Sequence, residues 1–260
     1  MERWTVVLTA SLLSVACATS PTGQTQLRLV PEQQLTEMGR AAYQQIKQET
    51  PVSKQDGQRA YVQCVADAIT RQVPGDAQWE VTLFEDDAVN AFALPGGKIG
   101  VYTGLLKVAE NQHQLAAVIG HEVAHVLAEH PNARVSAAYA TQAGLDIAQA
   151  LAGAPSSQKE SLFGLLGVGA QFGILMPYGR AQESEADVLG IDLMAKAGFD
   201  PRESVELWRN MAKAGGAQPP QFLSTHPATD TRIQQLQAAL PKVTAAYERA
   251  ATKPDCGPGK

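Results

Sequence analysis

Apolar side chains recur every three to four residues along most of the chain, which is the spacing of helices with one buried face. In residues 31–47, for example, Leu35, Met38, Ala42 and Ile46 fall on one side. The same pattern predicts helices over residues 31–47, 58–71, 110–130, 133–151, 162–176, 182–197, 202–214 and 230–249.

Prolines are expected to affect two of these helices, and a third is too short to span a membrane. Pro131 is expected to close the helix at 110–130, because a proline cannot continue a helix that it follows. Pro241 is expected to kink or break the last helix for the same reason. The apolar run at 162–176 is shorter than a membrane span, so it is predicted to be a buried helix.

Two other segments have the pattern of strands. Residues 79–84 alternate apolar and polar side chains, which is typical of a half-buried strand. The segment 89–104 consists of two short apolar runs on either side of Pro95-Gly96-Gly97. Because such a sequence favours a tight turn, we predict a β-hairpin here.

The first residues differ in composition from the rest of the chain. Arg3 precedes an apolar run at 6–15 that is too short to span a bilayer as a mature helix. Small residues then lead to Cys17, and this pattern resembles the cleavage site of bacterial lipoproteins. We therefore expect residues 1–16 to be a lipoprotein signal peptide and Cys17 to be the lipidated N-terminus. The alternative is an ordinary signal peptide with an incidental cysteine.

The expected anchor divides the chain into simple parts. Residues 17–30 are polar and are interpreted as a lipidated N-terminus with a flexible tether, 31–250 as one folded domain, and 251–260 as a C-terminal tail. Ala18 is not the aspartate that resembles an inner-membrane retention signal. The expected location is therefore the outer membrane of a bacterial cell envelope, with the domain facing the periplasm.

Composition and cysteine count change the picture only a little. The chain is 45% hydrophobic and 18% charged with a net charge of −5, as in ordinary globular domains. It contains no lysine- or arginine-rich run, so no nucleic-acid partner is expected. Cys64 and Cys256 remain after Cys17, and in an oxidising compartment they predict one disulfide. The alternative is two unrelated thiols.

The strongest chemical signal is the sequence HEVAH at residues 121–125. Residues four apart share a helix face, so His121 and His125 can bind one metal ion. Glu122 lies about 100° round the helix, where it can act as a general base on water. The alternative is an incidental pair on a surface helix, but the neighbours are apolar and a buried, unpartnered His-Glu-His would be costly.

Catalytic zinc takes three protein ligands and keeps one position open, so a third ligand is needed. His113 and His130 fall on other faces of the first helix and are expected to be solvent-exposed. Glu183 and Asp187 lie four apart on a later helix, so one carboxylate can bind zinc while the other orients a ligand histidine. Glu185 points to the other side and is expected to be solvated. A charged, solvated helix face is the alternative for all three acids.

Three segments together resemble one known family. They are NAFALPGGKIGVYTGLL at 90–106, HEVAH at 121–125 and RAQESEAD at 180–187. They are similar to the HtpX- and CAAX-prenyl-protease-like zinc metallopeptidases, within these to the lipoprotein or periplasmic branch that includes LoiP and BepA. The resemblance covers about residues 31–248 and implies that Glu183 is the third ligand and that Asp187 orients a ligand histidine. With the predicted elements, the expected fold is a single α+β, mostly helical, zincin-like domain with a small sheet beside the HEVAH helix.

The expected mechanism uses one zinc ion per chain. Zinc activates a water molecule, and Glu122 takes its proton and delivers it to the leaving amine. His226 lies in a histidine–proline loop similar to one in the family, and its ring is expected to face zinc. There it either stabilises the oxyanion or binds zinc as a fourth ligand that gates the site. The candidate substrate-binding residues are Asn90, Gly96, Gly97 and Arg232, with residues 90–101 as an edge strand for an extended peptide.

The resemblance implies a zinc endopeptidase that cleaves unfolded or misassembled cell-envelope proteins. Its expected partners are these polypeptides, a membrane through the lipid on Cys17, and an envelope-assembly machinery. The alternative is a chaperone-like or scaffold lipoprotein with a silent zinc site, against which the intact Glu122 argues. A tethered zinc-binding protein would carry histidine-rich tracts, whereas this chain has five histidines in all.

Overall fold

The computed structural model describes residues 17–75, 77–151, 178–214, 220–227 and 230–257. The expected signal peptide at 1–16 and the predicted helix at 162–176 lie outside these residues. Among the helices that the structure describes, none is long and apolar enough to cross a membrane.

Most of the described chain is helical, as the apolar spacing predicts. The helices are α2 (Glu32–Glu49), α3 (Asp56–Thr70), α4 (Gln112–Leu127), α5 (His130–Leu151), α8 (Arg180–Lys196), α9 (Glu203–Ala214), α10 (Gln221–Thr225) and α11 (Asp230–Arg249), with a 3-10 helix at Thr103–Lys107. Every predicted helix within the described residues is present. Their limits differ from the predicted ones by three residues or fewer.

The structure contradicts the helix end predicted at Pro131 and, of the kink or break predicted at Pro241, the break. Helix α4 ends at Leu127, and Pro131 lies in the first turn of α5, where a missing N–H leaves no helical hydrogen bond unmade. Between the two helices, Glu129 has a φ of 56°, in the left-handed region, and this redirects the chain. Helix α11 continues through Pro241, so the predicted break does not occur.

A three-stranded sheet contains the predicted hairpin. Its order is β3 (Glu80–Phe84), β5 (Lys98–Tyr102) and β4 (Ala91–Leu94), with β5 parallel to β3 and antiparallel to β4. Gly96 and Gly97 form the turn with φ values of 82° and 72°, which side chains with a Cβ rarely adopt. Because β5 is the central strand, β4 is an edge of the sheet.

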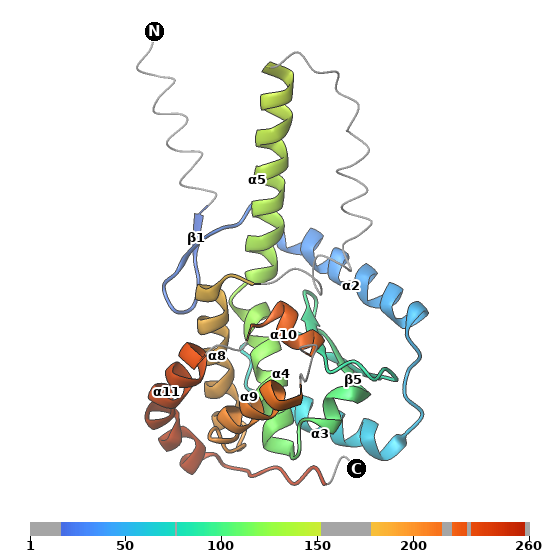
Figure 1. The fold of residues 1–260 in the computed structure, drawn as a ribbon, viewed down its shortest axis with the longest axis vertical. Coiled ribbons are helices and arrows are strands. Elements are labelled where there is room, and N and C mark those ends of the chain that lie inside the picture. Colours follow the sequence, from blue (N-terminus) through green and yellow to red (C-terminus); the bar gives the residue numbers. More distant parts are fainter. Residues whose placement is uncertain (1–16, 76, 152–177, 215–219, 228–229, 258–260) are drawn as a thin grey trace.

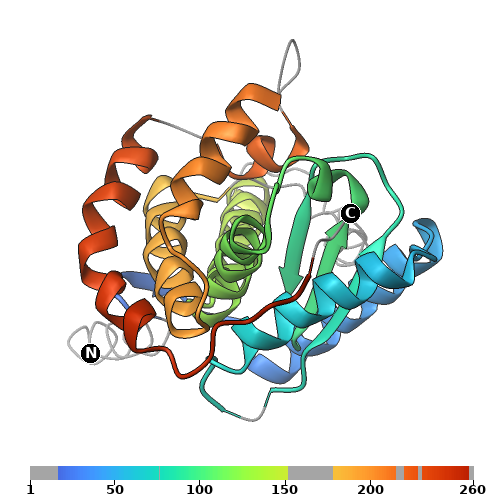
Figure 2. The same ribbon diagram turned by 90° about the horizontal axis from the view of Figure 1, so that it is seen from below.

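Helix α4 occupies the middle of the molecule. Seen from below, it lies between the sheet with α2 and α3 on one side, and α8, α9 and α11 on the other (Figure 2). Every residue from Gln114 to His125 is buried, which requires a helix that is apolar almost all round. Buried polar side chains need partners, so His121, Glu122 and His125 stand out on this helix.

The segment predicted to be a flexible tether is folded where the structure describes it. Strands β1 (Cys17–Thr19) and β2 (Thr25–Leu27) form an antiparallel hairpin, which we call the N-terminal hairpin. It lies beside α8 and the start of α5 (Figure 1). Gln24 Nε2 donates to the carbonyl of Ala181 at 3.2 Å, and Gln26 Nε2 donates to that of Ala128 at 2.8 Å. The expectation of flexibility is therefore wrong for these residues, because backbone pairing and these contacts hold them.

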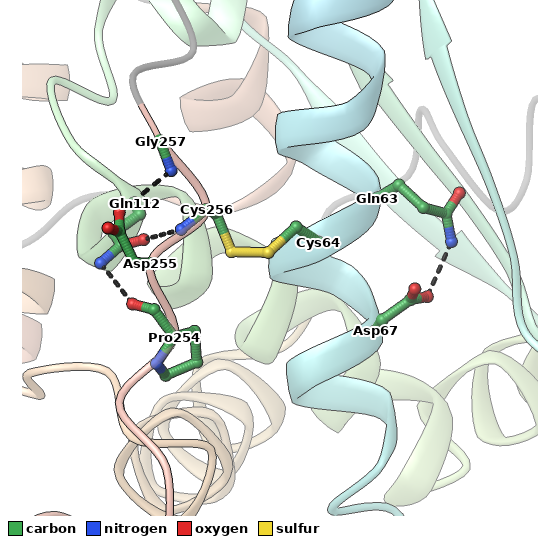
Figure 3. Close-up of a disulfide and its surroundings, with 8 residues drawn as sticks. All are labelled: Gln63, Cys64, Asp67, Gln112, Pro254, Asp255, Cys256 and Gly257. Atoms are coloured by element: carbon green, nitrogen blue, oxygen red, sulfur yellow. Dashed lines mark hydrogen bonds between the residues drawn. A yellow bond between two sulfur atoms is a disulfide. The ribbon is translucent and has the colours of Figure 1, made fainter.

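A disulfide joins Cys64 on α3 to Cys256 in the C-terminal segment, with the two Cα atoms 5.6 Å apart (Figure 3). Gln112, at the start of α4, bonds the same segment twice. Its Oε1 accepts from the Cys256 N–H and its Nε2 donates to the Pro254 carbonyl, each at 2.8 Å. The C-terminal segment thus connects α3 with the beginning of the central helix.

We expect Cys256→Ser to lower the free energy of unfolding by about 5 kcal/mol, because the chain-entropy account gives this value for a loop longer than about 100 residues. The two cysteines are 192 positions apart. Chemical denaturation of the full chain measures the change. Cys64→Ser is expected to give the same loss, because it removes the same disulfide from its other end. An unfolding free energy that is the same in Cys256→Ser as in the parent would contradict the prediction.

Candidate metal centre

Four side chains from three parts of the fold converge on one point. His121 and His125 lie on α4, Glu183 lies in the first turn of α8, and His226 directly follows α10. All four are buried. One nitrogen or oxygen atom from each lies within 4.8 Å of the corresponding atoms of the others.

The spacing of these atoms fits a shared cation. His121 Nε2 lies 3.1 Å from His125 Nε2 and 3.2 Å from His226 Nδ1, and the latter lies 2.9 Å from Glu183 Oε1. A neutral imidazole has a single N–H, and its other nitrogen carries a lone pair. Where nitrogens of three rings face one another, there are too few protons to form a hydrogen bond between each pair, so lone pairs point at the same space. A cation at the centre accepts all of these lone pairs, and imidazole with carboxylate is a ligand set that zinc prefers.

The close approach of α4 and α8 brings the acidic residues to the histidines. A Cβ on Gly120 would lie 2.9 Å from the Gly190 carbonyl oxygen, and a Cβ on Gly190 would lie 2.9 Å from the His121 backbone nitrogen. Only glycine at both positions lets the two backbones come this close. The glycine pair therefore sets the distance at which Glu183 and Asp187 reach α4.

Asp187 and Arg232 support the candidate ligands from behind. Asp187 Oδ1 lies 3.0 Å from His121 Nδ1, so the opposite ring nitrogen faces the centre. Arg232 contacts both carboxylates of Asp187 and Glu183: its Nε and Nη2 donate to Asp187 at 2.7 and 2.6 Å, and its Nη1 lies 2.7 Å from Glu183 Oε2. Its guanidinium also stacks over the Trp208 ring, 4.0 Å from the centroid. Arg232 is buried and bonded to the candidate ligand Glu183 and to Asp187, and its contact with substrate stays a prediction.

Glu122 lies between the centre and the sheet. Its Oε2 accepts the Ala93 N–H of the edge strand β4 at 3.3 Å, and its Oε1 lies 3.3 Å from His226 Nε2. Burial raises the pKa of Glu122 above its ordinary value, since a charged carboxylate is less well solvated there. The position fits a general base that serves a water molecule at the centre.

Burial and neighbouring charges determine the protonation of the candidate ligands. Burial lowers the pKa of His125 well below its ordinary value and keeps the ring neutral, the form that binds metal. Burial also opposes a charge on His121, but Asp187 and Glu183 outweigh it and raise the pKa to about 9. For Glu183, burial is outweighed by the three histidines, which hold its pKa far below the usual range. The carboxylates that attract a proton to His121 attract a divalent cation in the same way.

His130 and Glu185 are not on the surface, contrary to both predictions. His130 Nδ1 lies 2.9 Å from His125 Nδ1, and His130 Nε2 lies 3.2 Å from Glu185 Oε2. Both side chains are buried. Helical periodicity placed His130 on the outer side of one long helix, whereas the left-handed Glu129 turns the chain back towards the centre. Glu185 is covered by the N-terminal hairpin, which the sequence did not predict.

Tyr178 is a further residue that the sequence analysis missed. Its ring stacks on His125 with the centroids 3.7 Å apart, and the Arg134 guanidinium lies 3.6 Å from the tyrosine centroid. Burial raises the pKa of Tyr178 to about 12, so the phenol stays protonated. His113 is half-buried, and its Nδ1 accepts the Asp200 N–H at 3.2 Å. Its expected solvent exposure is therefore only partly right.

The two glycines predicted to bind substrate form the turn between β4 and β5. A Cβ on Gly96 would meet the Thr36 side chain of α2, and one on Gly97 would meet the carbonyl of Gln78. The turn therefore packs against its own scaffold, and substrate binding by the two glycines stays a prediction. Asn90 is buried, and its Oδ1 accepts the Ala91 N–H at 3.0 Å at the start of β4.

Residues 54–240 match the sequence profile of peptidase family M48. The chain belongs to this family. The matched region contains α4, α8 and His226, and hence all four candidate ligands and Glu122. Since M48 peptidases depend on zinc, the domain is a zinc metallopeptidase domain, and the predicted family, fold class, enzyme class and metal are confirmed.

Three relatives show how similar this chain is to known proteins. The chain is 37% identical to the mitochondrial metalloendopeptidase OMA1 of Schizosaccharomyces pombe over 169 residues, which are 64% of this chain and 48% of that protein. It is 31% identical to the metalloprotease YcaL of Escherichia coli over 174 residues, 66% of each chain. It is 32% identical to the beta-barrel assembly-enhancing protease of Yersinia pestis over 158 residues, 58% of this chain and 32% of that one. The chain thus spans about half the length of the yeast OMA1 proteins that it matches.

Proposed function

We propose that this protein is a zinc-dependent endopeptidase that cleaves unfolded or misassembled proteins of a bacterial cell envelope. The observation that carries the proposal is the convergence of His121, His125 and Glu183 on one point, with Glu122 between that point and an edge strand. The relatives support proteolysis by name, and one of them is a protease that enhances beta-barrel assembly. The restriction to envelope substrates is our inference.

The chain's own residues divide the chemistry among them. When bound, zinc polarises the scissile carbonyl and lowers the pKa of the attacking water towards about 7. His121, His125 and Glu183 hold the ion, with Asp187 and Arg232 fixing two of these ligands. Glu122 accepts the proton of the attacking water and passes it to the leaving amine.

Strand β4 offers a binding site for an extended peptide. Its outer edge carries the Ala91 and Ala93 amides, which bond the Asn90 and Glu122 side chains respectively. A substrate strand that pairs with this edge replaces such bonds with main-chain hydrogen bonds, which are independent of sequence. Because only an extended segment can pair in this way, the geometry favours unfolded substrates.

We assign His226 to gating. Its Nδ1 lies among the candidate ligands, so it completes a set of four, and a catalytic zinc site keeps one position open. His226→Ala is therefore expected to raise kcat/KM for a short unfolded peptide, measured with zinc in excess. A fall in kcat/KM with zinc content unchanged would mean instead that His226 stabilises the oxyanion.

The set of four ligands is also the observation that favours the alternative, a chaperone-like or scaffold lipoprotein with a silent site.

One experiment separates the proposed endopeptidase from this alternative. The zinc-loaded full chain is incubated with one polypeptide in its folded form and in a permanently unfolded form, and fragments are identified by mass spectrometry. The endopeptidase is expected to cleave the unfolded form only. Suppressed aggregation of the unfolded form without any new fragment would support the chaperone-like alternative and overturn the proposal.

The exposed Cys17 at the start of β1 supports attachment to a membrane by a lipid. In a bacterial host, Cys17→Ser is expected to move the protein out of the outer-membrane fraction or to leave residues 1–16 attached. Fractionation with immunoblotting and N-terminal mass determination measures this. An unchanged membrane fraction with residues 1–16 removed would contradict lipidation at Cys17.

A further inference from the structure

We propose that His130 and Glu185 form a relay that holds His125 in its metal-binding orientation and connects it to the N-terminal hairpin. The proposal rests on the proposed function, because it concerns the ligand set of the same zinc centre. His130 and Glu185 are positioning residues here, since neither side chain is among the four that converge on the centre.

The contacts define a single chain of hydrogen bonds. His125 Nε2 faces the centre, so its proton lies on Nδ1, where it can be donated to His130 Nδ1 at 2.9 Å. His130 then carries its own proton on Nε2 and donates it to Glu185 Oε2 at 3.2 Å. Each ring thus has one tautomer that satisfies both of its nitrogens. A carboxylate that accepts from a histidine in this way fixes ring orientation and raises ligand basicity.

The relay continues to the N-terminal hairpin. Glu185 Oε1 accepts the Thr22 hydroxyl at 2.7 Å and the Thr22 N–H at 3.2 Å. Thr22 lies in the turn between β1 and β2, five positions after Cys17. The same hairpin is held separately by Gln26, which bonds the Ala128 carbonyl at the end of α4. The docked hairpin therefore supplies hydrogen-bond donors to Glu185, which lies two residues after the candidate ligand Glu183.

Because Glu185 and His130 are buried, losing a hydrogen-bond partner there is costly. Glu185 is 3% exposed and His130 is fully buried, so a polar atom that loses its partner here does not regain one from water. Loss of Thr22 leaves a buried carboxylate with fewer donors, and loss of Glu185 leaves the His130 proton without an acceptor. Either change frees the His125 ring to rotate away from the centre.

The first test compares two substitutions of His130 in the full chain. In His130→Leu the His125 Nδ1–H loses its acceptor, whereas in His130→Asn the amide oxygen can occupy the place of the ring Nδ1. The zinc dissociation constant, measured by competition with a chelator, is expected to rise about 10- to 100-fold for leucine. The asparagine variant is expected to recover a substantial part of this loss. A purely structural role predicts the opposite order, because leucine suits a buried site better than asparagine.

The second test follows the relay outwards. Glu185→Gln keeps an acceptor oxygen but loses the charge, and it is expected to raise the zinc dissociation constant about tenfold. Thr22→Val removes only the hydroxyl and is expected to give a smaller but measurable increase. Gln26→Ala is the matched control, because it removes a separate hydrogen bond of the hairpin, to the Ala128 carbonyl, while the Thr22 contacts with Glu185 remain, and it is expected to leave zinc affinity unchanged. If the leucine variant does not fold, Glu185→Gln and His130→Asn carry the test.

Cobalt provides a readout that does not depend on activity. The visible absorption spectrum of the cobalt-loaded protein reports the geometry of the ligands, and it is expected to shift in His130→Leu and Glu185→Gln but not in Gln26→Ala. Parental spectra and parental zinc affinity in both relay variants would overturn the relay. Equal effects of Thr22→Val and Gln26→Ala would overturn the connection through Thr22. A parent chain that binds no zinc would instead refute the proposed function.

Discussion

Glu122→Gln is expected to abolish peptide-bond cleavage while the protein keeps its fold and its zinc. The substitution removes the group that accepts the proton of the attacking water but preserves the shape of the side chain. General acid–base catalysis is worth about 10²- to 10⁴-fold, so kcat should fall by at least this range. Hydrolysis of an unfolded polypeptide, quantified from its fragments, measures the loss.

The interpretation depends on what remains in this variant. Glu122 contacts the Ala93 amide and His226 but is not itself one of the four converging side chains. Zinc content equal to that of the parent is therefore the internal control. Cleavage at a rate close to that of the parent, in a preparation free of other proteases, would refute the role of Glu122 as the base.

Glu183→Gln is expected to weaken zinc binding by more than about 100-fold. Loss of a residue that only hydrogen-bonds a ligand can cost up to roughly 100-fold, and this substitution removes the charge of a ligand itself. It also removes one of the two carboxylates that Arg232 contacts, those of Glu183 and Asp187. Asp192→Asn is the matched control on the same helix, since Asp192 pairs with Lys196 and faces away from the centre. Chelator competition measures both variants.

Two results would identify the source of an error in this second prediction. Zinc affinity that is the same in Glu183→Gln and in the parent would mean that Glu183 is not a ligand. An equal loss in Glu183→Gln and Asp192→Asn would mean that any lost acid on α8 destabilises the domain.

The first pair of candidate ligands could be predicted from the sequence because it depends on one short helix. The spacing of His121, Glu122 and His125 fixes their relative directions, and the apolar residues around them predict burial. The segments that pack round this helix are also periodic enough to be predicted, apart from their ends. Assigning the third ligand required more, since spacing alone left the roles of Glu183 and Asp187 open.

The surroundings of the centre could not be predicted, because they depend on backbone geometry that no spacing rule contains. His130 was placed on the surface because the predicted helix continued through Glu129, where the chain in fact takes a left-handed conformation. Glu185 was expected to be solvated because nothing indicated that the polar residues 17–30 fold over it. The contacts of Arg232 with Asp187 and Glu183 were not predicted, because the sequence does not reveal that α11 packs against α8.

The central claim is that one zinc centre, formed by His121, His125 and Glu183, hydrolyses peptide bonds. The most direct measurement follows cleavage of an unfolded polypeptide by the purified full chain before zinc removal, after it, and after zinc is restored. The account predicts about one zinc per chain, loss of all new fragments when zinc is removed, and their return with one equivalent of zinc. Fragments that continue to form at the same rate in the zinc-free protein would contradict it.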